Sequence, residues 1–102
     1  MLAEFAIIPV GAGESLGDSI AGVVRLVDES GLPYRVSAMG TIIEGEWDEV
    51  MALIRKCHDM VLEEAPRAVS HISIDIRPSR PMDRLTEKLK SVETRLGKEL
   101  KG

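Results

Sequence analysis

The chain has 102 residues, with 13 Lys and Arg against 17 Asp and Glu, and a formal net charge of -4. This length predicts a single domain over residues 1–102, with enough chain to bury one hydrophobic core. The acidic balance, together with one Phe, one Tyr and one Trp, disfavours nucleic acid as a partner. Phosphates require a basic surplus, and bases require aromatic side chains on which to stack.

Cysteine usage and hydropathy predict the compartment. Cys57 is the only cysteine, so no intrachain disulfide can form, and a reducing interior is the simplest interpretation. The first residues lack the basic start of a secretory signal. No apolar run approaches the roughly 20 residues needed to cross a bilayer. We therefore expect a cytoplasmic protein that does not associate with membranes.

The first half of the chain predicts a strand followed by a helix. Leu2 to Val10 is rich in Ile, Val and Phe, which predicts a strand, and its apolar character indicates a central position. Ser15 can cap the next helix, with Asp18 three residues later. Gly31 supplies a helix stop. The apolar residues of this helix recur at helical spacing: Leu16, Ile20, Val23, Val24 and Val27.

A hairpin and a second helix follow. The segments Tyr34–Met39 and Thr41–Gly45 predict two strands joined through Gly40, and so short a link favours antiparallel pairing. A second helix is expected to begin near Glu46 and to end before Pro66. Its predicted buried stripe is Trp47, Val50, Met51, Ile54, Cys57 and Val61.

The last third predicts a fourth strand and a third helix. Polar and apolar residues alternate from Val69 to Arg77, which is the pattern of a half-buried strand. Pro81 suits the first position of a helix. That helix is expected to carry one apolar stripe, formed by Met82, Leu85, Leu89, Val92 and Leu96.

The predicted order is therefore β-α-β-β-α-β with an added C-terminal helix, an α+β arrangement of the ferredoxin-like type. Right-handed crossovers place the four antiparallel strands in the order 4-1-3-2. Two helices cover one sheet face and leave the other open. The first strand is apolar on both faces, with Phe5 and Ile7 alternating with Ala6 and Ile8. An uncovered apolar face is costly, so we expect a homo-oligomer.

Polar residues on two predicted strands point to the function. Ser37, Thr41 and Glu44 lie in the hairpin, and a polar series alternates with isoleucines in the last strand: His71, Ser73, Asp75 and Arg77. A sheet face with such groups is suited to hold either a small molecule or a second copy of the chain. Asp75 and Arg77 either form a structural ion pair, with each other or with Glu44, or recognise a polar ligand.

Motifs for metals, cofactors and catalysis are weak. Cys57 and His58 are neighbours on a helix and point about 100° apart, which is unsuitable for chelation. The Gly11–Gly17 segment follows a strand but misses the dinucleotide-binding spacing by one residue. We therefore expect no metal, no cofactor and no catalytic residue. A small-molecule enzyme with His71 as acid or base remains an alternative of lower rank.

Several segments together resemble a known family, the small thiamine-binding proteins. The resemblance covers nearly the whole chain, and its most specific motif runs from Met39 to Glu46. The supporting segments are Glu4-Phe5, Pro9-Val10-Gly11, Gly31-Leu32-Pro33-Tyr34, Asp48-Glu49-Val50 and Ile74-Asp75-Ile76-Arg77.

The resemblance implies a ferredoxin-like fold that assembles into dimers and often tetramers through its sheets. It implies binding of thiamine or its hydroxymethylpyrimidine part, without catalysis. Carried over by position, the ligand-binding residues are Ser37, Thr41, Glu44 and Arg77, with Phe5, Glu4 and Asp75 as further candidates. The alternative is a structural homo-oligomeric module in which these side chains only join subunits.

Overall fold

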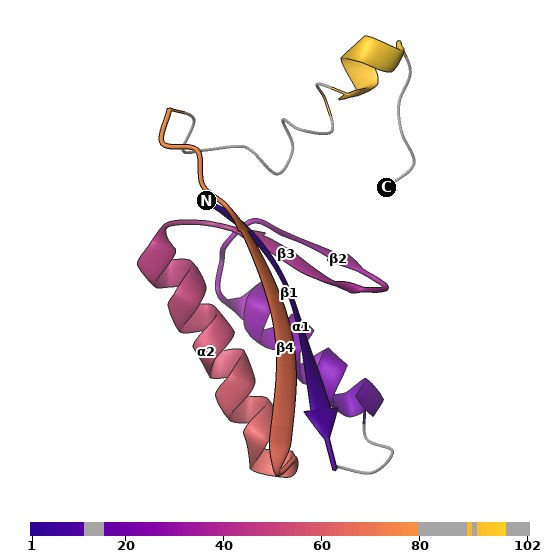
Figure 1. Cartoon of the computed structure of the whole chain (residues 1–102), viewed down its shortest axis with the longest axis vertical. Coiled ribbons are helices and arrows are strands. Elements are labelled where there is room, and N and C mark those ends of the chain that lie inside the picture. Colours follow the sequence, from indigo (N-terminus) through magenta and orange to yellow (C-terminus); the bar gives the residue numbers. More distant parts are fainter. Residues whose placement is uncertain (12–15, 80–89, 91, 98–102) are drawn as a thin grey trace.

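The computed structural model describes residues 1–11, 16–79, 90 and 92–97. Its elements in chain order are β1 (Leu2–Val10), α1 (Leu16–Glu29), β2 (Tyr34–Ser37), β3 (Gly40–Glu44), α2 (Trp47–Glu64) and β4 (Arg67–Asp75) (Figure 1). Residues 92–96 are helical.

The four strands form one antiparallel sheet in the order β2-β3-β1-β4. Read from the opposite edge, this is the order 4-1-3-2 expected from the sequence. The ferredoxin-like β-α-β-β-α-β prediction is therefore confirmed. Both helices lie on the same side of the sheet (Figure 1).

Strand register divides the sheet into two chemically different faces. Ala3 and Phe5 of β1 lie opposite Ile43 and Thr41 of β3, and directly paired side chains share a face. Ala3, Phe5 and Ile43 belong to the buried core beneath the helices. We call the other side of the sheet the open face; it carries Leu2, Glu4, Ala6, Ile8, Val10, Arg35, Ile42, Glu44, Arg67, Val69, His71, Ser73 and Asp75.

The core joins the helix-side face of the sheet to apolar stripes on both helices. Val23 and Val27 of α1 are buried together with five residues of α2: Val50, Leu53, Ile54, Cys57 and Val61. The two helices approach closely at Gly22, where an added Cβ would lie 2.8 Å from the sulfur of Met60. Fully burying a side chain of this kind contributes about 2 kcal/mol, so the core holds both helices to the sheet.

Local signals set several element ends. Gly31 has φ +78°, a left-handed conformation that glycine adopts without strain, and it follows α1 as the sequence predicted. At the start of α2 the backbone N–H of Glu46 donates to Oε1 of Glu49 at 3.2 Å.

At the middle of α2, His58 contacts the Ile54 carbonyl through Nδ1 at 2.8 Å and the Ser70 hydroxyl through Nε2 at 2.9 Å. The contact with Ser70 ties α2 to β4.

Some boundaries and core assignments from the sequence were wrong. Gly40 begins β3, and the hairpin turns at residues 38–39. The fourth strand spans Arg67–Asp75 and stops before Arg77. Trp47 is 50% exposed at the first turn of α2, whereas the unpredicted Leu53 is buried. Trp47 and Leu53 both lie near the edge of the apolar stripe of α2. The sequence period therefore did not determine which of the two is buried, and the packing of α2 against the sheet decided it.

Several expectations fall outside the described residues: the Ser15 cap, the start of the third helix at Pro81, and its stripe residues Met82, Leu85 and Leu89. Of that stripe, Val92 and Leu96 are described and are exposed. Among the described residues, no helix is both long and apolar enough to span a bilayer.

Candidate functional site

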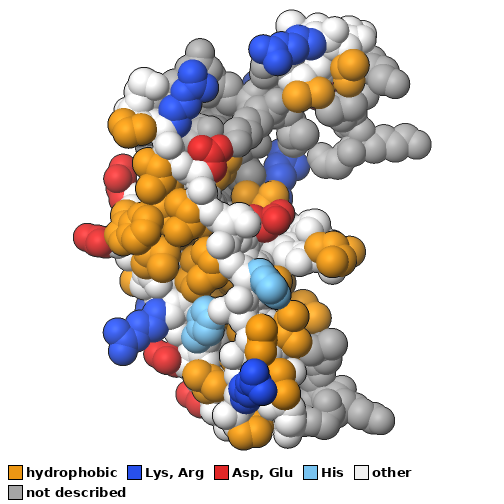
Figure 2. All heavy atoms as spheres, viewed as in Figure 1, with side chains coloured by type: hydrophobic (Ala, Val, Ile, Leu, Met, Phe, Trp, Pro, Cys, Tyr) orange, Lys and Arg blue, Asp and Glu red, His pale blue; other side chains and the backbone are white. Residues whose placement is uncertain are grey.

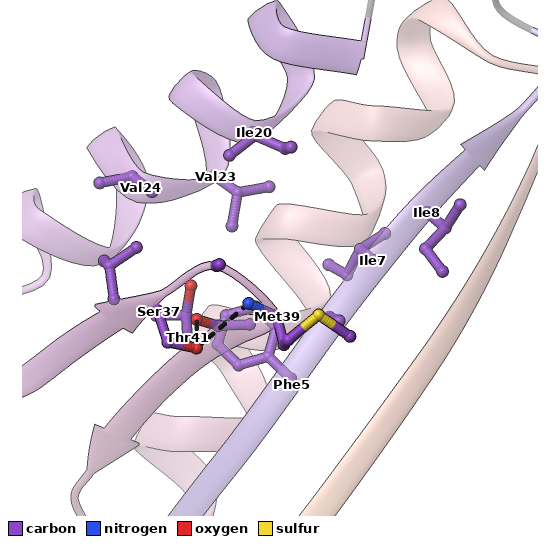
Figure 3. A pocket seen from close by; sticks show the side chains of 13 residues that line it. Phe5, Ile7, Ile8, Ile20, Val23, Val24, Ser37, Met39 and Thr41 are labelled. Carbon is purple, nitrogen blue, oxygen red and sulfur yellow. Dashed lines mark hydrogen bonds between the residues drawn. The ribbon is translucent and has the colours of Figure 1, made fainter.

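A pocket of about 360 Å³ lies between α1, the second half of β1 and the β2–β3 hairpin (Figure 3). Val23 points from α1 toward the sheet, and Phe5 and Ile7 approach from β1. The lining residues are Phe5, Ala6, Ile7, Ile8, Ile20, Val23, Val24, Val36, Ser37, Ala38, Met39, Gly40 and Thr41. A volume of this size falls within the range of small-molecule sites.

Unequal strand lengths create this pocket. β4 pairs with β1 along all nine residues from Leu2 to Val10. β3 pairs with β1 only from Leu2 to Phe5, because the hairpin reverses direction at residues 38–39. Beyond Phe5 the described residues place no strand on that side of β1. The space left beside the strand, beneath α1, is the pocket.

Phe5 and Thr41 form part of its inner wall. They are directly opposed partners in the β1–β3 ladder and are only 2% and 5% exposed, respectively. An aromatic ring offers a flat contact surface, and a hydroxyl both donates and accepts hydrogen bonds. The pair therefore combines stacking with polar recognition at one position of the sheet.

Ser37 supplies the second hydroxyl of the pocket, but this group also shapes the hairpin. Its Oγ donates to the Gly40 carbonyl at 3.2 Å and accepts from the Met39 backbone N–H at 3.3 Å (Figure 3). Met39, which lines the pocket at the hairpin tip, is 87% exposed. The hydroxyl of Ser37 thus fixes the turn that presents Met39 beside the pocket mouth.

Among the described residues, the remaining lining is apolar and carries no Asp, Glu, His, Lys or Arg. A fully enclosed charge would be poorly stabilised here, because burying an unpaired ion is costly. The arrangement instead suits an uncharged, flat ring with a few hydrogen-bonding atoms. Such a ring can stack on Phe5 and exchange a hydrogen bond with Thr41.

The seven predicted binding residues do not meet at one place. Phe5, Ser37 and Thr41 line the pocket. Glu4, Glu44 and Asp75 lie on the open face, where both Glu44 and Asp75 flank Leu2 across the strand pairs. Because strand side chains alternate between faces, consecutive residues such as Glu4 and Phe5 are separated by the sheet itself. The ligand role of all seven stays a prediction.

Arg77 stands apart from both groups. It lies two residues beyond the end of β4 and is exposed, and it does not line the pocket. The sequence pattern placed it on a strand face with Asp75, but β4 ends at Asp75. The expected shared strand face is therefore not formed.

The helical wall of the pocket was missed as a functional feature. Ile20, Val23 and Val24 were predicted only as apolar residues at helical spacing, yet all three line the pocket, and Ile20 is 52% exposed. A stripe of apolar residues looks the same in sequence whether it meets a sheet or an open space. The sequence offered one signal for the pocket. The apolar stripe of α1 is wide, whereas the two hairpin strands that it would have to cover are short.

Other reactive side chains lie elsewhere. Cys57 is buried in the core, and this burial raises the pKa of its thiol to about 11, so the thiolate needed for nucleophilic chemistry is scarce. His71 is exposed on the open face opposite Ala6 and does not line the pocket. In the part of the chain that the structure describes, no three His, Cys, Asp or Glu residues are grouped to hold a metal ion.

Known proteins resemble this chain in both sequence and fold. The UPF0045 protein Mb1933 of Mycobacterium bovis is 39% identical over 94 residues, covering 91% of each chain. The UPF0045 protein sll0230 of Synechocystis is 39% identical over 95 residues, covering 92% of this chain and 78% of its own.

Solved structures carry the same fold. The crystal structure of the hypothetical protein MJ1052 from Methanocaldococcus jannaschii matches with a TM-score of 0.80 and 32% identity, covering 89% of this chain and 93% of its own. A proposed thiamine biosynthesis or salvage protein of Thermotoga maritima matches with a TM-score of 0.77 and 21% identity, covering 89% and 96%. The family model for thiamine-binding proteins matches residues 3–93. The chain therefore belongs to the thiamine-binding protein family.

Proposed function

We propose that this protein binds thiamine or its hydroxymethylpyrimidine part without catalysis, with the pyrimidine ring in the pocket between α1, β1 and the hairpin. The observation that carries the proposal is the cross-strand pair of Phe5 and Thr41 in the wall of that pocket. Family membership supports a small-ligand role. We expect the protein to work as a single domain in the cytoplasm.

The aminopyrimidine ring matches the chemistry of the lining. It is flat and uncharged, so it suits the ring of Phe5 and the valines of α1. Its amino group and ring nitrogens complement a hydroxyl that both donates and accepts, which Thr41 provides. A hydrogen bond of this kind contributes about 1 kcal/mol to binding, and aromatic stacking contributes a similar amount.

The thiazolium ring of thiamine carries a positive charge and requires a different environment. Since no acidic residue lines the pocket in the part of the chain that the structure describes, we expect this ring to stay at the mouth, in contact with water. The acidic groups Glu4, Glu44 and Asp75 lie across the sheet and are not positioned to neutralise it within the same chain. Hydroxymethylpyrimidine should therefore bind at least as tightly as thiamine.

Calorimetric titration tests this proposal. Hydroxymethylpyrimidine should bind the wild type, and Thr41→Val, which keeps the shape but removes the hydroxyl, should weaken this binding about fivefold. The matched control is Ser73→Ala, which removes a hydroxyl from the open face and should leave affinity unchanged. Absence of binding by the folded wild type at millimolar ligand would contradict the ligand role, and an unchanged Thr41→Val affinity would contradict this pocket.

A second candidate function is a homo-oligomeric module, and the open face favours it. Ile8, Val10 and Val69 are 45%, 38% and 36% exposed there, although strand residues of this type are usually covered. Packing two open faces together would remove this apolar surface from water. Replacing Ile8 with Lys should then lower the mass measured by sedimentation, while an Ile20→Lys control on α1 should not.

A further inference from the structure

A serine and a histidine from different elements are hydrogen-bonded outside the ligand pocket. His58 lies on α2 and Ser70 lies twelve residues later, on β4, with its Oγ 2.9 Å from Nε2 of the imidazole. Neither residue lines the pocket. The sequence carries no local motif for the pair, because the two side chains meet only when α2 packs on the sheet.

The second ring nitrogen of His58 determines which atom carries the proton. Nδ1 lies 2.8 Å from the Ile54 carbonyl oxygen. A carbonyl only accepts hydrogen bonds, so Nδ1 is protonated and donates to it. In the neutral imidazole Nε2 then holds a lone pair, which accepts from the Ser70 hydroxyl. A hydroxyl bonded to a base, with the base oriented by a third group, is the arrangement of an activated serine nucleophile.

This pair can be reached from solvent and has apolar neighbours. Both side chains are half-buried, and Ser70 lies on the helix side of the sheet, opposite Ile7. Leu62, one helical turn beyond His58, is 47% exposed, and Ile72, the next residue of β4 on the same face as Ser70, is 38% exposed. Figure 2 shows hydrophobic side chains along α2 and beside β4, and histidine side chains open to the same surface.

We propose that Ser70 and His58 form a second, reactive site, in which Ser70 accepts an acyl group from an activated ester. Oγ of Ser70 bonds to the carbonyl carbon while Nε2 of His58 takes the hydroxyl proton. The bond from that carbon to the leaving oxygen breaks, and His58 returns the proton to the leaving oxygen. Water then repeats the sequence, releasing a carboxylic acid and restoring the serine. An apolar acyl chain would contact Leu62 and Ile72.

A fluorophosphonate probe tests the nucleophile on the wild-type chain. An alkyl fluorophosphonate bonds to an activated serine oxygen as fluoride leaves, and peptide mass spectrometry locates the label. A contact that only ties α2 to β4 would give Ser70 no advantage over other serines. Ser73 on the open face is the internal reference, because it is more exposed than Ser70. Ser70 should be labelled first, and labelling of Ser73 at the same rate or faster would overturn the proposal.

Replacing each histidine in turn tests the base. General-base catalysis contributes about 100-fold or more, so His58→Gln should slow the labelling of Ser70 by about 100-fold. His71→Gln is the matched control, because it removes an imidazole from the other face of the sheet, and it should label at the wild-type rate. Circular dichroism confirms that each variant is folded. An unchanged rate in folded His58→Gln, or an equal loss in His71→Gln, would contradict the role of His58.

Ester cleavage tests the acyl-transfer step itself. The wild type should release p-nitrophenol from p-nitrophenyl butyrate faster than the ester hydrolyses alone. Ser70→Ala should lose this release, whereas Ser73→Ala should keep it. Equal release by folded Ser70→Ala and the wild type would rule out the serine. Since neither His58 nor Ser70 lines the pocket, these results are independent of hydroxymethylpyrimidine binding, and failure of either proposal leaves the other standing.

Discussion

Thr41 lies directly opposite Phe5 in the β3–β1 ladder, and both side chains point to the helix side of the sheet. One cross-strand pair thus places a hydroxyl and an aromatic ring at the same pocket. Glu44, three residues further along β3, lies opposite Leu2 and faces the other side. The alternation of side chains in β3 therefore directs Thr41 to the pocket and Glu44 away from it.

Filling the pocket should block the ligand without unfolding the protein. Val36 lies opposite Thr41 in β2, lines the pocket and is half exposed. Val36→Trp adds bulk there, so the affinity for hydroxymethylpyrimidine should fall at least tenfold in calorimetry, with a stability change within about 0.5 kcal/mol. Val69→Trp on the open face is the control and should bind normally. Equal affinities in the two variants would place the ligand elsewhere.

The two faces of β3 should respond differently to the same truncation. Ile43 is fully buried beneath the helices, so Ile43→Ala should cost about 3 kcal/mol in urea unfolding through lost burial and the cavity left behind. Ile42, its neighbour on the open face, is half buried. Ile42→Ala should cost about 1 kcal/mol at concentrations where the chain is monomeric. Similar costs at both positions would contradict the assignment of the faces.

Two glycines of α1 should respond in opposite directions to alanine. Gly17 is surrounded by open space, with no atom within 4 Å of an added Cβ, so Gly17→Ala should stabilise by about 0.5 kcal/mol through helix propensity. At Gly22 the same carbon would lie 2.8 Å from the Met60 sulfur and methyl carbon. Gly22→Ala should therefore lower the melting temperature, by several degrees for each kcal/mol lost. A higher melting temperature for Gly22→Ala would mean that Met60 moves aside freely.

The buried thiol of Cys57 should make stability fall at alkaline pH. Its pKa rises from 9.0 to about 11 on folding because burial disfavours the thiolate. The folded state therefore holds its proton where the unfolded state releases it. The sign is a loss of stability as pH rises from about 9 to 11, reaching about 2 kcal/mol.

The comparison with Cys57→Ala isolates this effect. Other groups titrate in the same pH range, but they do so in both proteins. The difference in unfolding free energy between wild type and Cys57→Ala should shrink as pH rises from about 9 to 11. A constant difference across this interval would show that the thiol does not titrate with an altered pKa.

Periodicity and turn chemistry were sufficient to predict most of the fold. The apolar run of β1, the alternation in β4, the apolar stripes of α1 and α2, and Gly31 after α1 all act over a few residues, and each of these elements was observed. The crossover rules then determined the strand order, because few topologies connect these elements without a left-handed crossover. Strand ends were less predictable, since residues 38–39 and Gly40 suit a turn or a strand equally well.

The candidate site was predictable only in part. Phe5, Ser37 and Thr41 were named from the sequence and lie together at the pocket. Their separation from Glu4, Glu44 and Asp75 was not foreseen, because it depends on register between strands that are distant in sequence. The part of the pocket wall formed by α1 was also not predicted. Ile20 and Val24 are apolar, and an apolar residue has the same appearance in the sequence whether it lines a pocket or packs in a core.

The sequence by itself determined the secondary structure, the strand order and the family, because these follow from short-range patterns and short motifs. Only the tertiary structure decided where the pocket lies and which side chains line it. Those features depend on the unequal lengths of β3 and β4 along β1 and on how far each helix extends over the sheet. Both are properties of packing between distant segments, which no local pattern records.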